Sequence, residues 1–184
     1  MNNVEKLQKL CGLIDQMISQ HAWLRDRYAR RASTLDVILL VLSASLSALA
    51  FADIKGIVGG LVDVKLWLGG LSLTVFVASV VSWKVDWKGK ENSHGQTVDN
   101  LSQQKREILA LLDQEDGINS DTVAAVNASY AVISDKCAKV PESLFLKTKQ
   151  YHKRKVALSR ALDVSPGTFL WVIKLKLWWQ HTRK

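Results

Sequence analysis

The chain has few of the residues that build disulfide frameworks, metal centres or active sites. Its 184 residues include 2 cysteines and 4 histidines, and Cys11 and Cys137 lie far apart. The sequence has no CxxC pair, no Cys/His cluster with zinc-ligand spacing, no glycine-rich phosphate loop and no HExxH motif. We therefore expect no enzyme activity, no cofactor and no bound metal. Both cysteines are expected to be small buried hydrophobic residues.

Charge is missing from two long stretches, residues 37–52 and 66–83, which contain no Asp, Glu, Lys or Arg. A hydrocarbon core about 30 Å thick needs roughly 20 apolar residues in a helix. Two buried core helices of a soluble protein are the weaker interpretation, because a chain of 184 residues could hardly cover them. The sequence predicts a transmembrane hairpin with spans at about 35–53 and 66–84. Neither span holds a central ionisable residue, which argues against a proton-coupled transporter or a voltage sensor.

Basic residues flank the hairpin on one side. They are Arg25, Arg27, Arg30 and Arg31 before the first span and Lys84, Lys88 and Lys90 after the second. In the connecting loop, two lysines are offset by two aspartates. Because basic residues beside spans stay in the cytoplasm, we expect both termini on the cytoplasmic side of the membrane. The predicted contacts to the inner lipid headgroups are Arg27, Arg30, Arg31, Lys84 and Lys88.

Outside the hairpin, apolar residues recur every three or four positions and predict amphipathic helices. These helices cover residues 4–32, 96–113, 120–138 and 141–162. Ser33 followed by Asp36 resembles a capping box, so we expect the first membrane helix to start afresh there. A polar break is expected at 88–95. The predicted fold is an all-α membrane protein, with a two-helix transmembrane hairpin and a cytoplasmic helical bundle.

The chain divides into four predicted regions. These are an N-terminal cytoplasmic amphipathic helix (1–33), the transmembrane hairpin (34–87), a cytoplasmic helical region (88–163) and a basic, Trp-rich tail (164–184). Residues 141–184 hold ten Lys and Arg against Glu142 and Asp163, so they account for the whole net charge of +8. The tail has the composition of an interfacial helix. Two placements stay open for it, on the inner leaflet or against the cytoplasmic bundle.

Small residues recur in both spans. Those expected to bring helix backbones close together are Ala44, Ala48 and Ala52 in the first span and Thr74, Ala78 and Ser82 in the second. The candidates to line a water-filled path between protomers are Ser43, Ser47, Ser72 and Ser79. Packing alone also explains these serines, because a serine hydroxyl can bond its own helix backbone. Two spans cannot enclose a path, so this function requires a homo-oligomer of about four or more.

A basic segment near the C-terminus offers a second kind of site. Lys149, Lys153, Arg154 and Lys155 could neutralise the phosphates of a nucleic acid, with Tyr151 available to stack on a base. The alternative is a solvated helix face beside anionic lipid, which the adjoining hairpin favours.

The order of parts resembles the SLATT-type two-transmembrane effector family of prokaryotic conflict systems. The residues that carry this resemblance are RYARRASTLD at 27–36, leading into the first span, and YHKRKVALSR at 151–160. The resemblance covers most of residues 20–162. It implies a membrane-disrupting or pore-forming effector in anti-phage defence. Its trigger would be a separate partner, such as a sensor, a nucleotide-signal synthase or a reverse transcriptase.

Two hypotheses follow. The first is a membrane effector that oligomerises and permeabilises or depolarises the inner membrane when a partner triggers it, as in abortive infection. The second is a membrane-tethered binding module that recruits nucleic acid or an acidic protein through its basic C-terminal helix.

Overall fold

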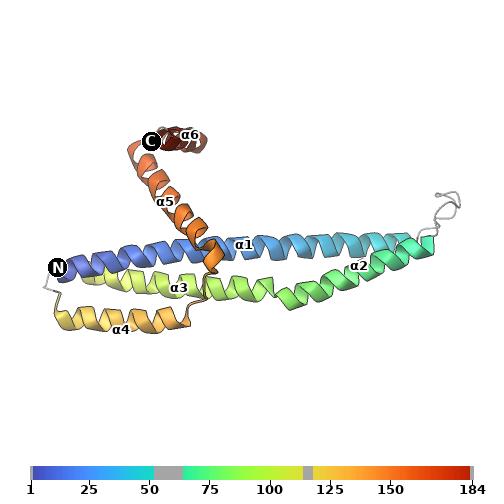
Figure 1. The fold of residues 1–184 in the computed structure, drawn as a ribbon, viewed down its shortest axis with the longest axis horizontal. Coiled ribbons are helices and arrows are strands. Elements are labelled where there is room, and N and C mark those ends of the chain that lie inside the picture. Colours follow the sequence, from blue (N-terminus) through green and yellow to red (C-terminus); the bar gives the residue numbers. More distant parts are fainter. Residues whose placement is uncertain (1, 52–63, 114–117, 183–184) are drawn as a thin grey trace. The chain divides into compact units, whose positions relative to one another are not determined.

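The computed structural model describes residues 2–51, 64–113 and 118–182, and within these ranges every regular element is an α-helix (Figure 1). The helices are α1 (Asn3–Phe51), α2 (Val64–Val85), α3 (Trp87–Leu112), α4 (Ser120–Lys136), α5 (Glu142–Val164) and α6 (Leu170–Thr182). The all-α prediction is confirmed. The loop between the two spans lies almost wholly outside the described residues, as does Ala52.

The chain forms two compact units. One contains Met1–Trp23 together with His94–Lys184, and the other is Leu24–Ser93. The second unit includes the C-terminal part of α1, all of α2 and the first turns of α3. It therefore holds both predicted membrane spans.

The prediction of a fresh helix start at Ser33 is wrong, because α1 is helical without a break from Asn3 to Phe51. Residues 13–51 contain no glycine or proline that would end a helix. Thr34, which lies beside the predicted cap, donates its hydroxyl to the carbonyl of Arg30 at 2.7 Å. A threonine bonded to the preceding turn is compatible with a continuous helix.

The predicted polar break at 88–95 is also wrong, because the interruption is a single residue, Asp86. Its backbone has a φ of 45°, in the left-handed region, and it separates α2 from α3. The Asp86 carboxylate accepts a hydrogen bond from the Gly89 N–H at 2.9 Å, which caps the start of α3. An added Cβ at Gly89 would collide with that carboxylate. Glycine at 89 therefore makes room for the cap.

The core of the first unit is built by one side of α1, α3 and α4. Its buried residues are Leu7, Ile14, Leu101, Ile108, Val123 and Val126. Cys11 and Cys137 are free thiols, partly buried and packed against this cluster. This placement agrees with their expected role as small hydrophobic residues.

Candidate functional site

The two predicted spans pack on each other along a heptad-like seam. Between residues 33 and 51 of α1, the side chains that are not fully exposed are Leu35, Leu39, Leu42 and Leu46. Between 66 and 85 of α2, they are Leu68, Leu71, Val75, Ala78, Ser82 and Val85. Both sets alternate steps of three and four, the spacing that keeps one stripe of a helix turned toward a partner. Figure 1 shows these parts of α1 and α2 side by side.

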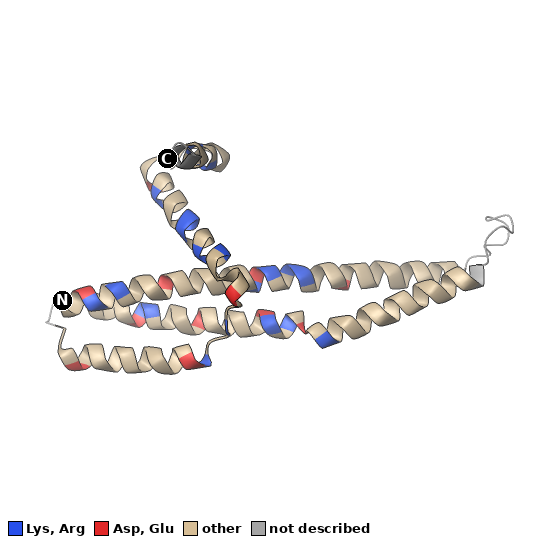
Figure 2. Ribbon diagram, in the orientation of Figure 1, with Lys and Arg blue, Asp and Glu red and all other residues tan. Residues whose placement is uncertain are grey.

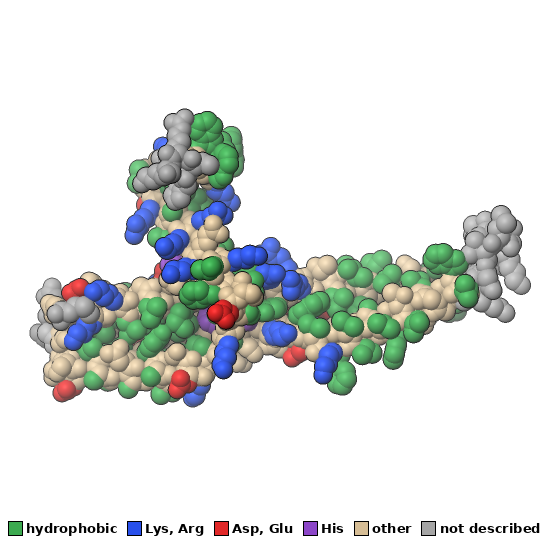
Figure 3. Space-filling model, viewed as in Figure 1, with side chains coloured by type: hydrophobic (Ala, Val, Ile, Leu, Met, Phe, Trp, Pro, Cys, Tyr) green, Lys and Arg blue, Asp and Glu red, His purple; other side chains and the backbone are tan. Residues whose placement is uncertain are grey.

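The rest of the hairpin surface is exposed and mostly apolar. α1 contains an 18-residue window with a mean hydropathy of 2.1, and the helical segment Leu66–Leu112 contains one of 1.7, with no residue buried in either window. In Figure 3, hydrophobic side chains cover much of the visible face of α1 and α2. The chain thus has two helices that are long and apolar enough to cross a membrane.

Five of the six small residues predicted to pack helices lie within the described residues, and only two of these five are in the seam. Ala78 and Ser82 lie in the seam, partly buried. Ala44 and Ala48 are exposed, and at 100° per residue they lie on the side of α1 opposite the seam. Thr74 is exposed and donates its hydroxyl to the carbonyl of Gly70 at 2.8 Å.

The four candidate pore serines lie on one side of the hairpin. Ser43 and Ser47 are about a quarter turn from the seam on α1, and Ser72 and Ser79 are about a quarter turn from it on α2, in the same rotational sense. Asp36, at the start of the first span, pairs with Lys88, just beyond the second, so the helices run antiparallel. Equal rotations on antiparallel helices that face each other point to the same side.

The hydroxyls of two of these serines are bonded within their own helices. Ser47 donates to the carbonyl of Ser43 at 3.0 Å, and Ser79 donates to that of Val75 at 2.8 Å. Ser45 does the same to Val41 at 2.8 Å but lies on the other side of α1. All four candidate serines are exposed. They form a polar stripe on the hairpin. In this stripe the hydroxyls of Ser47 and Ser79 already have a backbone acceptor.

A band of cations surrounds the base of the hairpin. Arg30, Arg31, Lys84 and Lys88 are exposed, and Arg27 is half-buried. The Lys88 Nζ lies 3.5 Å from an Asp36 carboxylate oxygen, and both side chains are more than half exposed. Figure 2 shows Lys and Arg gathered on this part of α1 and around the α2–α3 junction, while the rest of both spans is nearly uncharged.

In the first unit, a histidine pair lies buried between α1 and α3. The Nδ1 atoms of His21 and His94 are 2.9 Å apart, and the ring centroids are 5.1 Å apart. Burial, and secondarily the charge of His94, lowers the pKa of His21 to about 4. Burial also lowers the pKa of His94. Two protonated rings would place two donors against each other, so the contact requires at least one neutral imidazole.

Other polar contacts tie α1, α3 and α4 together. The Lys105 ammonium lies 2.7 Å from the Asp15 carboxylate, and the Ser129 hydroxyl donates to Gln104 Oε1 at 2.9 Å. The Ala138 N–H donates to the Thr97 hydroxyl at 3.1 Å. Burial raises the pKa of the nearby Cys137 thiol, which favours its neutral form. Within the described ranges, no three His, Cys, Asp or Glu residues form a metal-binding group.

The four predicted basic residues of α5 do not share one face. Lys153, Arg154 and Lys155 are exposed, and successive residues point about 100° apart around the helix. Lys149 is half-buried, with its Nζ 5.9 Å from the centre of the Phe145 ring. The buried side of α5 carries Thr148, which is fully enclosed.

The tail forms the helix α6 with two different faces. Ile173 is buried, whereas Trp171, Leu175, Trp178 and Trp179 are exposed and cover an arc of about 100°. Lys174 and Lys176 are exposed as well.

Comparison of the chain with protein-family models, with curated proteins and with solved structures finds no match. The resemblance to the SLATT-type family stays a prediction made from the sequence.

Proposed function

We propose that this chain is an effector of the bacterial inner membrane that oligomerises and permeabilises or depolarises that membrane when a partner sensor triggers it. In this proposal, the partner detects phage infection and the breach stops growth of the infected cell. The observation that carries the proposal is the hairpin itself. Its two apolar helices meet along a leucine-rich seam and turn four serines to one common side.

Exposed apolar area supports a position within lipid. The large side chains exposed on the hairpin are Val37, Ile38, Leu40, Val41, Leu49, Phe51, Leu66, Trp67, Leu73, Phe76, Val77, Val80, Val81 and Trp83. Leaving this set in water would cost on the order of 10–20 kcal/mol. A typical domain has a stability of only about 5–15 kcal/mol. Contact with lipid, or with further copies of the hairpin, removes this cost.

The outward position of the small residues supports assembly of several copies. Because the seam within one chain is made mainly by leucines, Ala44 and Ala48 are left on the outer side of α1. Small residues let helix backbones approach closely in lipid, where no hydrophobic force drives association. A ring of hairpins with their serine sides inward would have hydroxyls along its axis. The ring is closed by point-group symmetry and requires about four or more copies.

The remaining parts fit the same arrangement. The cation band holds the cytoplasmic headgroups, with both termini on the cytoplasmic side. The exposed Trp face of α6 favours the inner leaflet for the tail, since Ile173 is buried while Trp171, Trp178 and Trp179 are each more than half exposed. The chain's trigger in this proposal is a separate sensor, nucleotide-signal synthase or reverse transcriptase.

The test is expression of the chain in bacteria with a membrane-potential dye and a large DNA stain, alone and with its neighbouring genes under phage challenge. We expect depolarisation that Ser43→Phe and Ser72→Phe abolish. Ser45→Phe is the matched control, because Ser45 is an exposed serine on the same helix as Ser43 but lies on the other side. Depolarisation unaffected by all three substitutions would contradict a path along the serine side. A chain that stays monomeric in several mild detergents and in lipid discs would contradict the assembly.

The exposed basic residues of α5 support a second candidate, a membrane-tethered module that recruits nucleic acid or an acidic protein. Replacing Lys149, Lys153, Arg154 and Lys155 with Gln separates the two functions. A tether would lose its partner and its phenotype together, whereas a pore would still conduct when overexpressed.

A further inference from the structure

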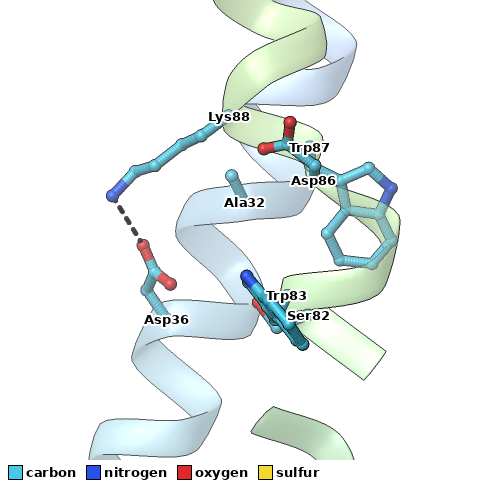
Figure 4. A pocket seen from close by; sticks show the side chains of 7 residues that line it. All are labelled: Ala32, Asp36, Ser82, Trp83, Asp86, Trp87 and Lys88. Carbon is cyan, nitrogen blue, oxygen red and sulfur yellow. Dashed lines mark ion pairs between the residues drawn. The ribbon is translucent and has the colours of Figure 1, made fainter. Parts of the chain in front are cut away.

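A cavity of about 390 Å³ lies at the base of the hairpin, where α1, α2 and α3 come together (Figure 4). Its lining residues are Ala32, Asp36, Ser82, Trp83, Asp86, Trp87 and Lys88. All of them belong to the same compact unit. The small side chain of Ala32 leaves room at the centre, with the Lys88–Asp36 ion pair on one side and Asp86 and Trp87 on the other.

The lining combines groups that recognise opposite charges. Two carboxylates, Asp36 and Asp86, and two indoles suit a cationic group, because a cation is attracted both by a carboxylate and by the face of an indole ring. Lys88 supplies the one positive charge and suits an anion. With two acidic groups and one basic group, the pocket favours a zwitterion over a ligand with only negative charge.

The Asp86 carboxylate caps α3 and also lines the cavity. Its Oδ1 accepts the Gly89 N–H, and Oδ2 has no hydrogen-bond partner among the described residues. Asparagine caps helices equally well and tolerates the left-handed backbone that Asp86 adopts. A charged group held in an uncommon conformation beside a cavity is a reason to look for a ligand.

The position of the pocket identifies the ligand class, and this step rests on the membrane placement proposed above. The lining residues lie where the apolar spans meet the exposed cations Arg30, Arg31 and Lys84, which is the depth of the lipid headgroups. A headgroup there presents its phosphate, and in some lipids an amine a few bonds away.

We propose that this pocket binds a phospholipid whose headgroup carries a primary amine, namely phosphatidylethanolamine. The ammonium donates to Asp36 and Asp86 beside the indoles, and the phosphate contacts Lys88. Phosphatidylglycerol has no amine to meet the carboxylates. A quaternary choline headgroup has no N–H to donate to Asp86. The outer cation band attracts anionic lipid in general, so selection for the amine is the signature of the pocket.

The test uses the full chain in lipid discs with equal amounts of phosphatidylethanolamine, phosphatidylglycerol and phosphatidylcholine, followed by mass spectrometry of the lipid that remains after detergent extraction. We expect phosphatidylethanolamine to be enriched about tenfold over both others, the factor expected for one charge-assisted hydrogen bond. Asp86→Asn keeps the cap but removes the charge, so each of Asp86→Asn and Asp36→Asn should lower the enrichment several-fold, and together they should abolish it. Asp99→Asn, an exposed substitution outside the pocket, should leave it unchanged.

Equal retention of the three lipids, or enrichment that survives both Asp36→Asn and Asp86→Asn, would overturn the proposal. Carbonate washing of membranes separates this failure from failure of the proposed function. If carbonate releases the chain from the membrane, both the membrane placement and the lipid pocket are contradicted. If the chain stays in the membrane but selects no amine lipid, only the lipid pocket is contradicted. Circular dichroism of each variant shows whether its helices are retained.

Discussion

Protonation of the His21–His94 pair should loosen the packing of α1 against α3 as the pH falls. The two Nδ1 atoms are 2.9 Å apart and both rings are buried, so a second proton cannot be accommodated without separating them. The pKa of His21 is lowered from 6.5 to about 4 in the folded chain. Between these two values, the unfolded chain binds a proton that the folded chain does not. Stability is therefore fully present above pH 6.5 and is lost as the pH falls toward 4.

The size of this effect follows from the shift. A difference from 6.5 to about 4 corresponds to about 3 kcal/mol at 1.36 kcal/mol per unit of pKa. The lowered pKa of His94 acts in the same direction. This is a large share of the free energy of unfolding of a typical domain, which is about 5–15 kcal/mol. The local opening of the first unit should become far easier at pH 4.5 than at pH 7.5.

Hydrogen exchange of the full chain in lipid discs measures this opening. After correction for the intrinsic exchange rate at each pH, amides of residues 3–23 and 94–112 should lose protection at pH 4.5. His21→Gln and His94→Gln keep a side chain that can hydrogen-bond but cannot titrate, so each should weaken the pH dependence. Protection that is equal at both pH values, or a pH dependence unchanged in the double variant, would refute this reasoning.

Three further predictions concern stability, measured by thermal unfolding of the full chain in one detergent. Gly89→Ala should destabilise the chain by about 1 kcal/mol or more, because the added Cβ displaces the Asp86 cap. Gly12→Ala should stabilise it by about 0.5–1 kcal/mol, because nothing lies within 4 Å of the Cβ position at residue 12. Equal effects of the two substitutions would contradict the cap. Leu42→Ala, in the seam, should cost about 1–2 kcal/mol, and the 70% exposed Leu40→Ala clearly less; the reverse order would place the seam elsewhere. Ser129→Ala should cost about 1 kcal/mol by removing the donor to buried Gln104, and Ser102→Ala, which is outside this contact, should cost less.

Much of the fold can be predicted from the sequence, because long uncharged runs and apolar residues spaced by three or four positions are local patterns. The seam leucines Leu35, Leu39, Leu42 and Leu46 follow a heptad, but the sequence prediction did not assign the packing to them. It assigned the packing to Ala44 and Ala48, because small residues commonly bring helices together in membranes. In one chain the leucines make the contact and the alanines face outward.

Other features depend on how distant segments are aligned. His21 and His94 are 73 positions apart, and only the packing of α1 on α3 brings their rings together. The predicted break at 88–95 missed the interruption at Asp86, because a single aspartate with a left-handed backbone has no sequence pattern comparable to a glycine-rich turn. The predicted helix start at Ser33 does not form, because residues 13–51 contain no glycine or proline at which α1 would end.

The central claim is that copies of the hairpin assemble with their serine sides facing one another. Disulfide crosslinking in native membranes tests it directly, in a Cys11→Ser, Cys137→Ser chain carrying one new cysteine at a time. Ser43→Cys should give crosslinked dimers under mild oxidation, and Ser45→Cys, two residues away on the opposite side of α1, should not. Monomers for both variants, or crosslinks at 45 and none at 43, would contradict the account.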